Sequence, residues 1–295
     1  MKIAVIGTTT PAGFTIVESL SAEESVERVF SLNLPDFNPA DAANVRQVFE
    51  TLQPDLIVNA FLFPDPDRAD QHPNTLRTVH VRAAEALCAA AHAIGARVAL
   101  ISSARVFSGN REHRESGFTE HDEPIPDGMF AVSLRDAEMI VAASSGGLVI
   151  RRGELFGPLP QGGSPSFVDR IVRAARRTNR VLVVDGDRHS PIYSRDLAAS
   201  LTPLLLDPDL IPATKTGRYL HIANSGPASR LELAEATLRL LDSKSEAVPI
   251  SPEEYGADAP RSDDTALDLS LLESMTSGTA PRPWRDALKK HIDAV

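Results

Sequence analysis

The first twenty residues read as one unit, made of a strand, a turn that contains glycine, and a helix. Residues 2–6 form a short apolar run that ends at Gly7, as buried strands of parallel sheets do. A turn reaches Gly13, and apolar residues then recur near helical spacing as far as Leu20. Dinucleotide-binding α/β domains open in this way, because a helix N-terminus offers N–H donors and a positive dipole to a pyrophosphate.

The turn departs from the glycine pattern G-x-x-G-x-x-G, because Thr10 stands at the middle position. A Cβ atom at this position crowds the place where backbone approaches phosphate. Two hypotheses follow: a weakened or altered nucleotide site, or a packing turn that binds nothing. On the first hypothesis, the residues of the turn that contact a cofactor are Gly7, Thr9, Thr10, Pro11 and Gly13.

The same alternation of strand and helix continues along the chain. Short apolar runs at 26–32, 56–60, 96–102 and 148–150 are separated by helical patterns at 39–52, 75–94 and 129–143. This order predicts an α/β fold with a doubly wound parallel sheet, the Rossmann arrangement. Beyond residue 150 the spacing loosens. The elements expected there are helices at 167–177, 194–206, 231–241, 269–275 and 284–292, strands at 180–184 and 219–222, and loops at 153–166 and 249–264.

Ligands of such sheets bind at the carboxyl ends of the strands. Residues 8–13, 59–61, 102–105 and 152–154 all follow strands, so we expect them to converge on one crevice. Asn59, Ala60, Phe61 and Ser102 therefore join the predicted cofactor contacts. Asn33 ends the second strand, where an acidic residue usually holds the adenosine ribose. Because Asn33 is neither acidic nor basic, the choice between NAD and NADP stays open, and weakened or absent cofactor binding is a second expectation.

Charge and composition exclude several classes of function. The net charge is −10 and no basic run exceeds Arg176–Arg177, which argues against a nucleic-acid or anionic membrane surface. One cysteine rules out an intrachain disulfide and fits a cytoplasmic protein, and no apolar run reaches transmembrane length. We expect no metal site: the histidines lack ligand spacing, and the loop with Asp65, Asp67 and Asp70 contains prolines and no closing glutamate.

Six stretches in the same order resemble one family, the dTDP-4-dehydrorhamnose reductases of the extended short-chain dehydrogenase group: 53–60, 101–109, 150–158, 190–198, 266–268 and 283–288. The resemblance covers nearly the whole chain. It implies a dinucleotide-binding domain at 1–152 plus about 190–223, and a substrate-binding lobe at 153–189 plus 224–295. A nucleotide-sugar site would lie between the two, and NAD(P)H would reduce a keto-sugar there.

The family's catalytic pair is missing. A tyrosine donates the proton to the carbonyl oxygen, and a lysine four residues later lies on the same helix face. These positions fall on Phe130 and Leu134, and no Y-x-x-x-K occurs anywhere in the chain. Ser103 alone remains, at the Ser/Thr position. Ser103 is either a remnant of the catalytic site or a residue whose hydroxyl bonds to backbone at a strand end. The second interpretation is preferred.

Other positions that line the family's site also differ. Arg105 replaces an aromatic residue, Glu154 a tryptophan and His80 a helix asparagine. These changes are either surface drift or a rebuilt pocket, in which Arg105 and Glu154 would be candidate catalytic groups beside the apolar wall of Phe130. On the second hypothesis the substrate pocket comprises Arg105, Phe130, Arg152, Glu154, Tyr193 and Arg195.

Three functional hypotheses follow. The preferred one is a reductase-like protein that has lost this hydride chemistry and binds a nucleotide or small ligand, or regulates a partner enzyme. This resembles the regulatory subunit of methionine adenosyltransferase. The second is an enzyme with repurposed chemistry in a biosynthetic pathway, and the third is an NAD(P)-dependent oxidoreductase without the usual donor. The expected ligand is a small molecule, with a nucleotide-sugar as the default, and a homodimer is compatible with each hypothesis.

Overall fold

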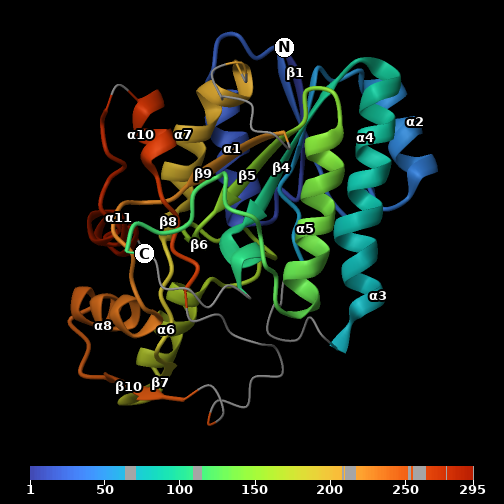
Figure 1. Ribbon diagram of the computed structural model, residues 1–295. Helices are drawn as coiled ribbons and strands as arrows, with labels where there is room; N and C mark the ends of the chain where they lie inside the picture. The colour runs from blue at the N-terminus through green and yellow to red at the C-terminus, as the bar shows by residue number, and fades with distance from the viewer. Residues whose placement is uncertain are drawn as a thin grey trace.

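Six parallel strands form the central sheet of the computed structural model, which describes residues 1–63, 71–108, 115–207, 209, 217–251, 254, 264–276 and 278–294. The strand order is β2-β1-β3-β4-β5-β9, and Figure 1 labels β1, β4, β5 and β9 among these strands. The strands are β1 Lys2–Ile6, β2 Arg28–Leu32, β3 Leu56–Asn59, β4 Arg97–Ser103, β5 Leu148–Arg152 and β9 Arg218–Ile222. The predicted doubly wound sheet is confirmed, and β9 adds a sixth strand beyond the first five.

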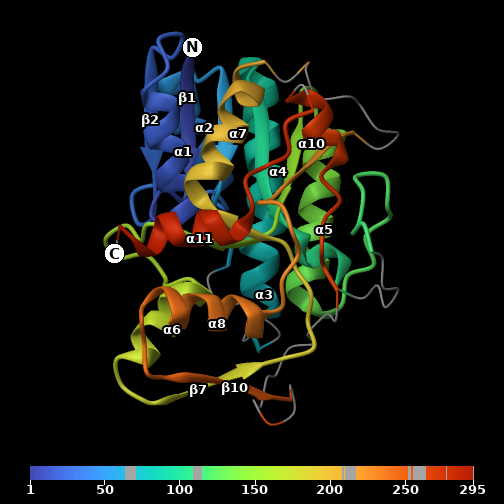
Figure 2. The ribbon, with the colours of Figure 1, turned by 90° about the vertical axis from the view of Figure 1, so that its left-hand side faces the viewer.

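Helices cover both faces of this sheet because successive side chains of a strand point to opposite sides. Ile3 and Val5 pack toward α1 (Pro11–Ser21) and α7 (Ser194–Leu206). Ala4 and Ile6 pack toward the other layer of helices, which Figures 1 and 2 show on the opposite face of the sheet from α1 and α7. That layer consists of α2 Ala42–Leu52, α4 Ala83–Ile94 and α5 Gly128–Ala143.

The long helix expected at 75–94 is divided into three parts. It begins as α3 (Pro73–Leu76), continues as a π-helical segment (Arg77–Arg82) and becomes α4. Gly95 ends it in the left-handed conformation, with φ 73°, as glycine commonly does at helix C-termini. Such π segments are frequent at functional sites, and this one contains His80, which bonds to the amide of Phe63 just beyond the end of β3.

The smaller lobe packs α6 (Phe167–Ala175) against α8 (Arg230–Leu240), over a two-stranded parallel sheet (Figure 2). Two expectations of loops are wrong here. The loop expected at 153–166 contains β6, and the loop expected at 249–264 begins inside β10. Both strands depend on pairing with distant segments, which local sequence does not reveal. The elements are β6 Glu154–Phe156 with β8 Pro191–Tyr193, β7 Arg180–Val184 with β10 Glu246–Ile250, and the helices α10 Ser270–Met275 and α11 Trp284–Ile292.

The carboxyl ends of the sheet strands face the smaller lobe. The N-terminus lies at the top of Figure 1, so β1 and its parallel neighbours run downward toward α6 and α8. Because β9 and α7 pack with the sheet, we propose the division expected from the sequence, with the dinucleotide-binding domain at 1–152 plus about 190–223.

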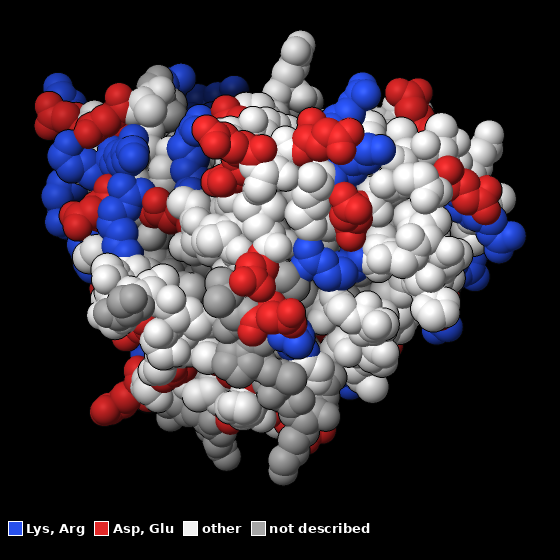
Figure 3. Space-filling model, turned by 90° about the horizontal axis from the view of Figure 1, so that it is seen from above, with Lys and Arg blue, Asp and Glu red and all other residues white. Residues whose placement is uncertain are grey.

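The surface and the helices add two further observations. On the face opposite the smaller lobe, acidic and basic side chains lie close to one another (Figure 3). Among the described residues, no helix is both long and apolar enough to cross a membrane.

A buried ion pair joins α5 to the sheet. The guanidinium of Arg151 on β5 contacts Glu138 through Nε at 3.1 Å and Nη2 at 2.9 Å, and both side chains are at most 3% exposed. Ser102 donates to the other carboxylate oxygen of Glu138 at 2.5 Å. The guanidinium also lies 4.5 Å from the ring centre of Tyr219 and 5.0 Å from that of Phe107. The network therefore fixes α5, β4, β5 and β9 together.

We predict that Glu138→Ala lowers the free energy of unfolding by about 3–5 kcal/mol, because it leaves the Arg151 charge buried without its partner. Asp136→Ala is the matched control on the same helix, since its ion pair with Arg135 is 37–41% exposed and such pairs contribute about 0–1 kcal/mol. Urea unfolding of both variants measures the difference. Equal losses in the two variants would contradict this assignment.

Candidate functional site

The N-terminal turn packs too closely for side chains at its two glycines. A Cβ on Gly13 would lie 2.3 Å from the carbonyl oxygen of Gly7, and one on Gly7 would lie 2.8 Å from the backbone of Phe61. Gly7 also has φ 80°, which favours glycine. The turn is therefore held directly against the end of β3.

Thr10 forms the N-cap of α1. Its hydroxyl donates to the carbonyl oxygen of Gly7 at 2.8 Å and accepts from the amide of Gly13 at 3.0 Å. Thr10 thus bonds one of the amides that a helix N-terminus would otherwise offer to a phosphate. The expected weakening of the site acquires a second cause besides the crowding by its Cβ.

Two further strand ends meet this turn. The side-chain amide of Asn33 donates to the Thr8 hydroxyl at 2.6 Å, and its buried Oδ1 has no hydrogen-bond partner among the described residues. At the end of β3, the carbonyl of Ala60 accepts from the Thr10 hydroxyl at 3.3 Å, and Asn59 accepts from the amide of Phe61 at 3.2 Å. The structure therefore brings together the predicted cofactor contacts of β1, β2 and β3.

The two serines at the end of β4 point in different directions. Ser102 is bonded to the buried Glu138, so its hydroxyl faces the α5 layer. Ser103 is paired in register with Arg152, so these two side chains share the other face of the sheet. The Ser103 hydroxyl accepts from the amide of Arg105 at 3.3 Å and caps a 3-10 turn, Ala104–Phe107. This is the backbone-bonded arrangement preferred from the sequence.

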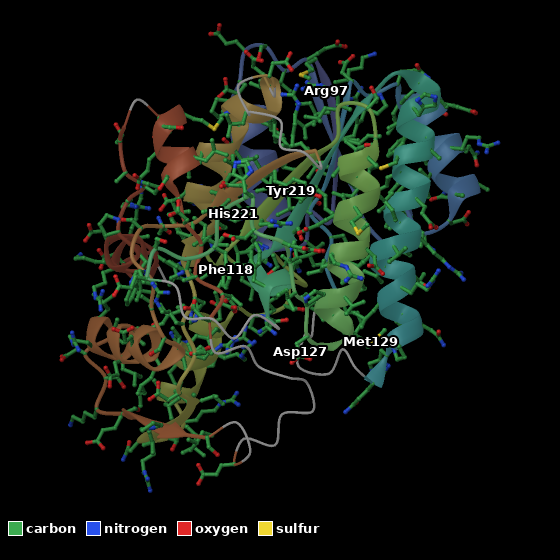
Figure 4. All side chains as sticks on the ribbon, in the orientation of Figure 1. Arg97, Phe118, Asp127, Met129, Tyr219 and His221 are labelled. Atoms are coloured by element: carbon green, nitrogen blue, oxygen red, sulfur yellow. The ribbon has the colours of Figure 1, made fainter. Side chains whose placement is uncertain are left out.

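Apolar packing fills the positions of the missing tyrosine and lysine. Phe130 lies in the first turn of α5, which begins beside the labelled Asp127 and Met129 in Figure 4. Phe130 is 7% exposed and Leu134 is fully buried. Both belong to a cluster with Leu76, Ala104, Val106, Phe107, Phe118 and Leu267. Phe130 is therefore part of a buried apolar cluster that packs against the 3-10 turn containing Arg105.

His221 on β9 packs at the edge of this cluster, against the ring of Phe107. It lies beside Phe118 (Figure 4), whose carbonyl oxygen is 3.0 Å from its Nδ1. Burial lowers the pKa of His221 to about 3, so the ring is neutral. The cluster thus contributes no proton donor of the family's type.

His80 connects the apolar cluster to the end of β3. The amide of Phe63 donates to Nε2 at 3.1 Å, so the ring proton is on Nδ1, which lies 2.7 Å from the Ser133 hydroxyl. Ser133 in turn donates to the carbonyl of Phe130 at 3.0 Å. Burial lowers the pKa of His80 to about 4. The neutral ring can accept from the Phe63 amide and donate to the Ser133 hydroxyl at the same time.

Three of the charged residues expected in the rebuilt pocket, Arg105, Arg152 and Glu154, lie near one another. The pKa of Glu154 is about 2: burial would raise it, but the guanidinium groups of Arg230, Arg105 and Arg152 lower it more. Arg230 contributes from α8, with Nη2 3.7 Å from Glu154 and Nη1 2.6 Å from Asp187. We call the six residues Arg105, Arg152, Glu154, Asp187, His189 and Arg230 the charged cluster.

Three members of the charged cluster were missed from the sequence. Asp187, His189 and Arg230 come from the smaller lobe, and Arg230 lies 43 positions after Asp187. Only the position of Asp187 and His189 just before the family-like stretch 190–198 offered a signal. Their place in the cluster depends on tertiary packing, because α8 must pack as it does for Arg230 to reach Asp187.

The remaining predicted pocket residues lie elsewhere. The ring of Tyr193 is 3% exposed and stacks on Phe156 at 5.6 Å, in the core of the smaller lobe. Arg195 is half exposed and pairs with Glu18 of α1 at 3.1 Å. Neither has a described contact with the charged cluster. Asp65, Asp67 and Asp70 lie outside the described residues, and within the described part no group of side chains could hold a metal ion.

Comparison with known proteins identifies the family. The family model described as RmlD substrate binding domain matches residues 1–295. The chain belongs to this family. It is 28% identical over 99% of its length to the Bacillus subtilis spore coat polysaccharide biosynthesis protein SpsK, covering 96% of that protein. It is also 29% identical over 97% of its length to the Mycobacterium tuberculosis dTDP-4-dehydrorhamnose reductase, covering 91% of it.

A solved structure shares the fold. The dTDP-4-dehydrorhamnose reductase of Bacillus anthracis in complex with NADP superposes with a TM-score of 0.86, at 20% identity, over 100% of this chain and 99% of that one. The resemblance drawn from the six stretches is therefore confirmed. Within this family, the chain has phenylalanine and leucine at the positions that our motif comparison aligned with the tyrosine and lysine.

We predict that His80 makes stability depend on pH. Burial lowers its pKa from the ordinary value of 6.5 to about 4 in the folded protein, so the unfolded state binds more protons between these two values. The contribution of His80 to the free energy of unfolding is therefore fully present above pH 6.5 and is lost as pH falls toward 4. The loss is about 1.4 kcal/mol per pH unit for this single histidine. Urea unfolding between about pH 4.5 and 7 measures this slope.

His80→Asn removes the share of this slope that comes from His80, whatever its effect at neutral pH. His221 and His291, whose pKa values burial also lowers, keep a residual slope. His92→Asn is the matched control, because His92 is exposed on α4. A slope in His80→Asn equal to that of the unchanged protein would show that His80 is not buried in the neutral form.

Proposed function

We propose that this protein binds a nicotinamide dinucleotide or a related nucleotide, together with a small ligand, and does not carry out the Tyr/Lys reduction of a keto-sugar. In this role it acts as a ligand-binding or regulatory protein. The observation that carries the proposal is the burial of Phe130 and Leu134 in an apolar cluster. A phenyl ring has no proton to donate, and a positioned general acid typically contributes about 10²–10⁴ in rate.

Several features support retention of nucleotide binding. The glycines, the helix N-terminus and the strand ends of the site keep their packing. Asn33 presents a buried amide oxygen without a partner, at the position where the fold usually holds a ribose hydroxyl. An amide oxygen can accept such a bond, but it lacks the charge of a carboxylate, which fits weaker binding.

A non-redox role has a precedent among relatives. Mouse methionine adenosyltransferase 2 subunit beta is 26% identical over 86% of this chain, and it is named as a subunit of a transferase. The second candidate function, an enzyme with repurposed chemistry, is favoured by one observation, the charged cluster around Glu154. Under that candidate, Arg105→Ala and Glu154→Ala abolish an activity that the preferred proposal does not require.

Cofactor binding tests the proposal. We expect NADPH or NADH to bind the cofactor-free protein, as seen by nicotinamide fluorescence and calorimetry. Thr10→Gly should bind several-fold more tightly, because the Gly13 amide is released and the Cβ removed, and glycine at an N-cap costs the helix only about a few tenths of a kcal/mol. Thr10→Ser is the matched control, since it keeps the capping oxygen.

Two results would contradict the proposal. No binding of either cofactor at millimolar concentration, in both the unchanged protein and Thr10→Gly, would overturn the nucleotide-binding role. Steady oxidation of NADPH by the unchanged protein with a keto-sugar nucleotide would overturn the loss of reductase chemistry.

A further inference from the structure

The charged cluster is not explained by cofactor binding. It lies where the resemblance places aromatic residues of a sugar pocket, at the positions of Arg105 and Glu154. Its members come from both lobes: Arg152 ends β5, Glu154 begins β6, and Arg230 begins α8. Charges gathered from separate elements at the carboxyl edge of a parallel sheet point to a ligand rather than to a solvated surface.

Arg230 is neutralised within the cluster. Its Nη1 contacts Asp187 at 2.6 Å, its backbone amide donates to the same carboxylate at 2.9 Å, and Nη2 lies 3.7 Å from Glu154. Its side chain is 11% exposed. Arg230 and Asp187 therefore form a supporting pair, which holds Glu154 in place from the smaller lobe.

Arg152 is held differently. Its Nη1 donates to the carbonyl of Gly153 at 2.7 Å, and among the described residues no carboxylate lies within 4 Å of its guanidinium. Burial and the nearby charge of Arg105 lower its pKa to about 10, although Glu154 raises it. Arg152 thus remains a cation at neutral pH, with donors that the described residues do not use, on the sheet face that it shares with Ser103.

His189 supplies a second, independent sign of a ligand. It is 4% exposed, yet among the residues that the structure describes neither ring nitrogen has a hydrogen-bond partner. Nδ1 lies 3.6 Å from Asp187, beyond hydrogen-bond distance. Buried polar groups are nearly always bonded. The contact with Asp187 accounts for Nδ1, so Nε2 is the atom of this imidazole whose hydrogen bond a bound molecule could complete.

We propose that the charged cluster binds the carboxylate of an acidic sugar-like ligand, with the carboxylate on Arg152 and a ligand hydroxyl donating to Glu154. This inference rests on the proposed function, in taking a nucleotide-linked sugar as the carrier. A carboxylate fits better than a phosphate monoester, because the three guanidinium groups and the two carboxylates of the cluster leave a net charge of about +1, which a single carboxylate neutralises and a dianion exceeds. Glu154, being ionised, only accepts hydrogen bonds, which suits a hydroxyl.

Matched pairs of sugar nucleotides test this directly by calorimetry. The probes are UDP-glucose against UDP-glucuronic acid, and dTDP-glucose against dTDP-glucuronic acid, which differ only at the carboxylate. We expect the acidic member of at least one pair to bind about tenfold more tightly or better, as one charge-assisted hydrogen bond provides. Arg152→Gln should abolish this preference while changing the affinity for the neutral member less than twofold.

Two control variants sharpen the result. Arg135→Gln removes a half-exposed guanidinium of α5 that pairs with Asp136, and it should keep the full preference. Arg152→Lys keeps the charge but not the planar fork, and it should keep part of the preference. The thermal midpoints of all variants establish that each is folded.

Three results would overturn the inference. These are equal affinity for both members of each pair, a preference that survives in Arg152→Gln, and absence of binding by all four probes at millimolar concentration. If inorganic phosphate displaced the bound acidic sugar nucleotide more strongly than acetate did, the choice of a carboxylate as the ligand group would be overturned. Titration with NADPH in the same preparation tests the proposed function separately, because it does not depend on Arg152.

Discussion

The guanidinium of Arg151 determines how the layers of this protein meet. It is buried between the rings of Phe107 and Tyr219 and paired with Glu138. A buried charge is tolerated only if it is paired and hydrogen-bonded, so α5 must dock with Glu138 at this point of the sheet. That docking places the first turn of α5 beside the end of β4, where the chemistry of this fold is expected.

The residues in the first two turns of α5 carry the proposed function. Phe130 and Leu134 lie there and pack in an apolar cluster with Ala104, Val106 and Phe107 of the 3-10 turn that contains Arg105. Charged residues lie instead at the end of β5 and the start of β6, where Arg152 and Glu154 stand, and Glu154 contacts Arg230 of the smaller lobe. The structure thus keeps the fold of the family, with apolar packing at the positions aligned with the tyrosine and lysine, and we propose that ionised groups replace the sugar pocket.

The fold could be predicted from the sequence because its signals are local. The buried strands are continuous apolar runs, and Gly95 and the N-cap residues Thr10 and Asp41 end or begin helices by their own chemistry. The short strands β6 and β10 escaped prediction because distant pairing stabilises them. The charged cluster was predicted only in part: Arg105 and Glu154 stood out by comparison with the family, whereas Asp187 and Arg230 depend on the packing of α8.

The central claim is that this fold brings a nucleotide and a ligand together without transferring hydride. A single-turnover experiment tests it most directly: protein in excess is mixed with NADPH and dTDP-4-dehydrorhamnose, and absorbance of the reduced nicotinamide is followed, with an active dTDP-4-dehydrorhamnose reductase measured alongside. Our account predicts that NADPH stays reduced in this protein, or is oxidised at least about 10² times more slowly than in the reductase. Oxidation at a comparable rate would contradict the account, and would mean that a donor other than a tyrosine supplies the proton.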